Sequence, residues 1–122
     1  MGYSYDRRAS GGGDCYEANG KFFMDQAVFP GGNTTMRLVH GEVTGQGRMA
    51  GVNYGHAWIE DGGTVIDKSN GKDLRMPKKA YYALGNIEAN ANMHVYTPAQ
   101  FRKKVMQFEH WGPWDLVTST GF

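Results

Sequence analysis

The spacing of apolar residues in the first half of the chain predicts a helix, which is followed by strands. In residues 14–29, with the sequence DCYEANGKFFMDQAVF, apolar side chains recur every three or four positions, as in an amphipathic helix. Asp14 stands at the expected N-cap, so Cys15 falls in the first helical turn. Residues 29–35, with the sequence FPGGNTT, end this helix because they contain turn-forming residues.

Extended segments follow the first helix. Residues 36–43, 55–61 and 64–68 are expected to be strands, and residues 92–97 a further short strand. A glycine-rich loop, residues 44–54, separates the first two strands, whereas only Gly62 and Gly63 clearly separate the second from the third. A pair of glycines between two strands is typical of a hairpin.

Two more helices are expected in the second half of the chain. Residues 76–87 have Pro77 near their start and Gly85 near their end, which is the usual asymmetry of a helix. The last helix begins at a capping box formed by Thr97 and Gln100, and Gly112 followed by proline ends it. This order of elements predicts an α+β domain with a mostly antiparallel sheet.

Length and charge narrow the classes of function. The 122 residues suit one domain, which we place at residues 14–122, after a flexible N-terminal segment at residues 1–13. Thirteen basic and twelve acidic side chains leave no strong field, so nucleic acid is an unexpected partner. No apolar run suggests a membrane span or a secretory signal, and we therefore expect a cytoplasmic protein. The aromatic residues in 110–122 are expected to pack on the sheet or to form a homo-oligomer contact.

Cys15 is the only cysteine, which excludes an intramolecular disulfide and any zinc site with several cysteines. The positive end of a helix dipole stabilises a thiolate, and N–H groups in the same turn can donate to an oxyanion. A nucleophile needs this placement. The carboxylate of Asp14 opposes a thiolate nearby unless it is turned into capping.

The hairpin can be tested for a partner to this thiol by counting residues. If Gly62 and Gly63 form a two-residue turn, Trp58 opposes Asp67, and His56 becomes a diagonal neighbour of Asp67 at roughly 7–8 Å between backbones. A four-residue loop brings His56 and Asp67 directly opposite each other. A three-residue loop without a bulge places them on opposite faces, which would exclude a shared site.

The segments HAWIE, at residues 56–60, and VID, at residues 65–67, follow a cysteine at a helix start. In this order they resemble the transglutaminase-like branch of the papain-like cysteine protease and acyltransferase superfamily. The resemblance implies a papain-like core with Cys15 as nucleophile, His56 as general base and acid, and Asp67 as the orienting carboxylate. It also implies acyl transfer through a thioester on a peptide or protein substrate, by hydrolysis, deamidation or transfer to an amine, without a cofactor.

Other interpretations of the same residues remain open. His40 is a rival base, because its strand neighbours the strand of His56. Tyr54, at the end of the glycine-rich loop, is expected to border a substrate groove. The fold could also serve as a non-catalytic binding module for a peptide, a small molecule or a partner protein.

Metal binding is a weaker interpretation. His40 with Glu42, or His56 with Glu60 and Asp67, offers imidazole and carboxylate ligands. Neither set has the helical His-x-x-x-His spacing of known zinc sites, so no metal is expected.

Overall fold

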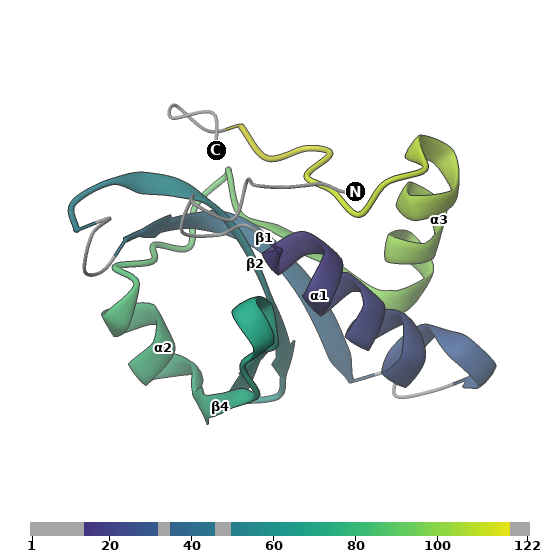
Figure 1. Ribbon diagram of the computed structural model, residues 1–122, viewed down its shortest axis with the longest axis horizontal. Coiled ribbons are helices and arrows are strands. Elements are labelled where there is room, and N and C mark those ends of the chain that lie inside the picture. The colour runs from purple at the N-terminus through teal and green to yellow at the C-terminus, as the bar shows by residue number, and fades with distance from the viewer. Residues whose placement is uncertain (1–13, 32–34, 46–49, 118–122) are drawn as a thin grey trace.

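A five-stranded antiparallel sheet runs through the centre of the protein (Figure 1). This computed structural model describes residues 14–31, 35–45 and 50–117, so the segment expected to be flexible, residues 1–13, lies outside it. The sheet order is β4-β3-β2-β1-β5. The strands are β1 (Met36–Thr44), β2 (Asn53–Asp61), β3 (Thr64–Asp67), β4 (Leu74–Pro77) and β5 (His94–Tyr96).

Helices cover both faces of this sheet. In Figure 1, α1 (Cys15–Phe23) and α3 (Pro98–Phe108) lie on one side and α2 (Lys78–Leu84) on the other. The first helix continues as a π-helical turn, η2 (Met24–Val28), and a 3₁₀ turn, η3 (Phe29–Gly31). A further 3₁₀ turn, η5 (Ser69–Gly71), follows β3. The α+β class and the antiparallel sheet predicted from the sequence are confirmed.

The turn between β2 and β3 contains two residues, which is the shortest of the three loop lengths considered from the sequence. Asp61 pairs with Thr64, Glu60 with Val65 and Ile59 with Ile66, which leaves only Gly62 and Gly63 unpaired between the strands. Gly62 has φ +64°, a left-handed conformation that glycine adopts without a steric penalty. Continuing this register by alternation puts Asp67 on the same face as Trp58 and His56.

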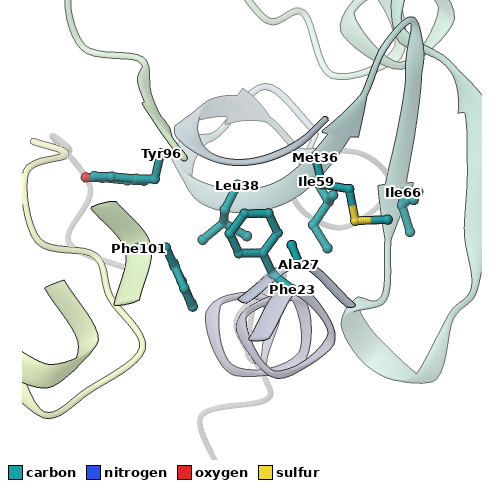
Figure 2. Packing of buried hydrophobic residues seen from close by; sticks show 8 residues of the cluster. All are labelled: Phe23, Ala27, Met36, Leu38, Ile59, Ile66, Tyr96 and Phe101. Carbon is teal, nitrogen blue, oxygen red and sulfur yellow. The ribbon is translucent and has the colours of Figure 1, made fainter. Parts of the chain in front are cut away.

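Two apolar clusters hold the layers together, one on each face of the sheet. On the α1 side, Phe23 packs with Leu38, Ile59 and Phe101 (Figure 2). The cluster on the α2 side consists of Val39, Val43, Trp58, Val65, Tyr81 and Ile87. The side chains of the central strands thus alternate between two buried faces, which is why most residues of β2 are buried.

The boundaries of several elements differ from the prediction. Leu74–Pro77 is a strand at the edge of the sheet, whereas the sequence suggested that a helix began at Met76. Pro77 misled the prediction because proline suits both a first helical turn and an edge strand. Tyr54 belongs to β2 rather than to the preceding loop, since that strand begins at Asn53.

The final helix starts as predicted and stops early. The capping box is present, with the Thr97 side chain accepting from the Gln100 N–H and the Gln100 side chain accepting from the Thr97 N–H. The helix ends at Phe108, before Gly112, because Glu109 takes a left-handed conformation with φ 59°. Among the described residues, no helix is long and apolar enough to cross a membrane.

Candidate active site

Cys15 is the first residue of α1, and its side chain is fully buried. Asp14 occupies the N-cap position, as predicted, but its carboxylate makes no capping hydrogen bond. The Asp14 Oδ1 instead accepts from the Asn70 N–H at 2.7 Å. This acidic group is therefore tied to the turn η5, and it does not occupy the N–H groups at the start of α1.

Asp67, the last residue of β3, has both carboxylate oxygens occupied. Its Oδ2 contacts the His56 Nε2 at 3.1 Å and accepts from the Tyr81 hydroxyl at 2.8 Å. Its Oδ1 accepts from the Ser69 N–H at 3.0 Å and from the Asn19 Nδ2 at 3.2 Å. Burial acts to raise the pKa of Asp67, but the bonds to His56 and Ser69 outweigh it and hold the pKa far below its usual range. The side chain is thus held as a carboxylate.

His56 contacts Asp67 through one ring nitrogen, Nε2. Among the described residues, its Nδ1 has no hydrogen-bond partner of regular geometry. Electrostatic interaction with Cys15 is the largest influence that raises the pKa of His56. Burial lowers the pKa of His56, but the charge of Cys15 and the bonds to Asp67 and Cys15 outweigh it and raise the pKa to about 10. The structure therefore pairs His56 directly with Asp67 and relates Cys15 to His56 through their electrostatic interaction.

Two residues that sequence reasoning missed also hold this group. Asn19 is fully buried one turn after Cys15, where its Nδ2 donates to the Ala57 carbonyl at 2.9 Å and its Oδ1 accepts from the Lys68 N–H at 2.8 Å. Its spacing of four from Cys15 was a signal, because residues i and i+4 share a helix face. Tyr81, on α2, had no such signal, because its bond to Asp67 crosses 14 residues of chain.

His40, the rival base, lies on the other face of the sheet. It pairs with Ala57, while the neighbouring Gly41 pairs with His56. Residues adjacent on one strand point to opposite faces, so the two imidazoles are separated by the sheet. Burial, and then the charge of His94, lowers the pKa of His40 to about 3. The His40 ring contacts the aromatic rings of Tyr16, Tyr96 and Trp114.

Tyr54 borders a cavity of about 130 Å³, together with His56 and Asp67. The rings of Tyr54 and His56 meet edge to face, with their centroids 6.1 Å apart. Cys15 does not line this cavity, although its charge contributes to raising the pKa of Tyr54, after burial. The thiol is therefore not part of the cavity wall.

No metal site accompanies these groups in the part of the chain that the structure describes. Glu60, one of the ligands considered from the sequence, is engaged elsewhere. It accepts from the Trp58 Nε1 at 3.0 Å and from the Tyr82 hydroxyl, and it pairs with the Lys78 Nζ at 3.2 Å.

Comparisons with family models, curated proteins and solved structures found no match to this chain. The geometry of the site is therefore the basis for inferring function.

Proposed function

We propose that this protein is a small cysteine-dependent hydrolase or acyltransferase with a papain-like, transglutaminase-like core. Its nucleophile is Cys15, His56 exchanges protons, and Asp67 orients the imidazole and stabilises its cationic form. The observation that carries the proposal is the imidazole bound to Asp67 through Nε2, with Nδ1 left without a regular partner. Cys15, at a helix start, interacts electrostatically with this ring.

The chemistry follows from these positions. The Cys15 thiolate attacks an amide carbonyl, and a C–S bond forms as the carbonyl electrons move onto oxygen. The N–H groups of the first turn of α1 have no carbonyl partner within the helix and can donate to that oxyanion. When the C–N bond breaks, His56 delivers a proton to the leaving amine. Water or an amine then cleaves the thioester and returns a proton to His56.

Asp67 acts in this scheme without exchanging a proton itself. Four hydrogen bonds saturate its oxygens, so it remains ionised and fixes which imidazole nitrogen faces the thiol. An imidazolium and a thiolate side by side stabilise each other by Coulomb attraction, and both are largely removed from water.

A second candidate is a non-catalytic binding module, and one observation favours it. Cys15 is fully buried and is absent from the cavity wall, so a substrate would reach the thiol only if the neighbouring side chains moved. A module of this kind would keep the His56–Asp67 pair for stability and would use the cavity alone.

The rate of Cys15 alkylation by iodoacetamide distinguishes the two candidates. For an enzyme, the rate at pH 6–7 should exceed that of a free peptide thiol, because a free thiol is mostly protonated below its pKa of about 8.5. The substitution His56→Ala should remove this advantage and restore fast reaction only above about pH 8.5. Mass spectrometry measures both rates against pH, with Cys15→Ala as the blank.

Wild-type labelling no faster than the peptide thiol would exclude the nucleophile and leave the binding module. Equal rates in wild type and His56→Ala would show that the imidazole does not activate the thiol.

A further inference from the structure

The cavity beside His56 lies on the α2 face of the sheet. It is lined by the last residues of β1, the first half of β2, the turn η5 and the end of α2. His56 and Asp67 are part of its wall, so it is continuous with the candidate active site. The charge of Cys15 also contributes, after burial and Asp67, to the raised pKa of Tyr81, another wall residue. The thiol is thus an electrostatic neighbour of two residues of the cavity.

The wall of this cavity contains both kinds of side chain, with more apolar than polar surface. Four aliphatic side chains line it: Val43, Leu74, Leu84 and Ile87. Leu84 is 53% exposed, which leaves apolar surface at the cavity that a ligand could cover.

Several of the polar groups in the wall are already engaged by the protein itself. Asp67 has four hydrogen bonds, one of which comes from the Tyr81 hydroxyl. Lys72 also faces Asp67, with its Nζ 4.0 Å from the Oδ2. In the catalytic state of the proposed function, the negative charges of Asp67 and Cys15 offset the positive charges of Lys72 and His56, so the site favours an uncharged ligand over an ionic one.

The size of the cavity limits what it can hold. A water molecule has a share of about 30 Å³ in the liquid, so a cavity of about 130 Å³ holds roughly four non-hydrogen atoms. A branched or linear aliphatic group of four carbons matches this volume.

We propose that this cavity is the specificity pocket of the site and binds an uncharged aliphatic side chain, of leucine, isoleucine or methionine size, next to the bond that Cys15 attacks. This inference rests on the proposed function for its catalytic meaning. The binding itself depends only on the cavity.

Two unreactive amides of nearly equal shape test the binding. N-isopentylacetamide ends in two methyl groups, and N-(2-carbamoylethyl)acetamide ends in a primary amide. We expect the first to shift the methyl NMR resonances of Val43, Leu84 and Ile87, with an affinity at least about tenfold higher than that of the second. Equal affinities, a preference for the primary amide, or no shift of these methyl groups would overturn the pocket.

Variants locate the effect. Leu84→Glu places a charge on the wall at an exposed position, so the protein should still fold while the preference for the aliphatic amide falls below about twofold. Met106→Glu makes the same charge change on α3, where Met106 is 63% exposed and does not line the cavity. This control should keep the wild-type preference. An unchanged preference in Leu84→Glu would contradict the location.

Reactive analogues connect the pocket to the thiol. The chloroacetamides with the same two N-substituents should alkylate Cys15 with the same aliphatic preference, of at least about tenfold. Unsubstituted 2-chloroacetamide reports thiol activation alone, so fast reaction without preference would contradict only the pocket. Slow reaction that His56→Ala does not change would contradict only the proposed catalysis, because the NMR binding test does not need the thiol.

Discussion

Asp67 supplies the fixed negative charge of the site, because four hydrogen bonds keep its carboxyl group ionised. A carboxylate that accepts four bonds has no oxygen left for a substrate, so its influence passes through His56. The pair is also a stability element, since removing one partner of a buried ion pair leaves an uncompensated charge.

Asp67→Asn should therefore lower both the free energy of unfolding and the reactivity of Cys15. We expect a loss of roughly 3 kcal/mol at pH 6, measured by urea unfolding. The loss should depend on pH in a defined direction. Asp67 stabilises the fold above the ordinary carboxyl pKa of about 3.8, because its folded pKa is depressed. The contribution of His56 is full below its ordinary pKa of about 6.5 and disappears as pH rises through its folded pKa of about 10.

The difference in stability between wild type and Asp67→Asn should accordingly be largest between about pH 4 and 6.5 and should shrink towards pH 10. Tyr81→Phe is the matched control, because it removes one neutral donor from the same oxygen and should cost only about 1 kcal/mol. A difference that does not change with pH would show that Asp67 acts by packing rather than by charge.

Asn19 is the link between elements, since one side chain joins α1 to β2 and to the end of β3. It bonds the Ala57 carbonyl, the Lys68 N–H and the Asp67 carboxylate, all from a fully buried position. The helix that carries the thiol and the strands that carry its partners are thereby held in one arrangement.

Asn19→Ala should leave the Ala57 carbonyl and the Lys68 N–H without this partner and should lower the free energy of unfolding by about 3 kcal/mol. The alkylation rate of Cys15 at pH 6–7 should fall as well, measured at a temperature where the variant is folded. Thr97→Ala is the control, because it breaks the N-cap of α3 and should cost about 1 kcal/mol without changing alkylation. Wild-type alkylation in Asn19→Ala would contradict a positioning role.

The elements predicted well from the sequence are those fixed by local rules. The Gly62–Gly63 turn and the capping box at Thr97 depend on residues within a few positions of one another. The capping box was predicted, and the two-residue turn was one of the three loop lengths considered. The shared face of His56 and Asp67 followed from the turn by alternation alone. By contrast, β4 exists because its residues pair with β3, and Pro77 fits a helix start equally well. The bonds of Asn19 and Tyr81 to Asp67 join residues 48 and 14 positions apart, and the local spacing of apolar residues does not predict contacts at such separations.

At the scale of the whole molecule, the C-terminal segment closes the α1 face of the sheet. His40 lies there against Tyr16, Tyr96 and Trp114, and among the described residues neither of its ring nitrogens has a hydrogen-bond partner. A Cβ on Gly112 would come within 2.6 Å of the His40 ring, so the segment packs directly on the imidazole. Charging His40 would require water or another partner to reach it.

Acid should therefore destabilise the protein through His40. Because the folded pKa is lowered to about 3, the contribution of neutral His40 is full above its ordinary pKa of about 6.5 and is lost as pH falls below it. One such group costs about 3 kcal/mol between pH 6.5 and 4. His94 pairs across from His40 on β5, and Asp115 is the nearby acidic group that partly opposes this shift.

His40→Met has a similar volume and cannot titrate, so it should remove about 3 kcal/mol of the acid sensitivity. Urea unfolding at pH 6.5 and pH 4, followed by tryptophan fluorescence, compares the two proteins while the other titrating groups stay the same. Equal acid sensitivity in wild type and His40→Met would show that His40 gains its proton without opening the segment.

The two imidazoles of β1 and β2 divide the sheet into two compartments. The pKa of His40 is about 3 and that of His56 is about 10. Between these pH values His40, on the aromatic side, is neutral, and His56, on the side of Asp67, is protonated. The sheet thus separates two buried environments, one of which favours a neutral imidazole and the other a protonated one. Substitutions around His40 could therefore change the stability of the protein in acid without changing the protonation of His56 and Asp67.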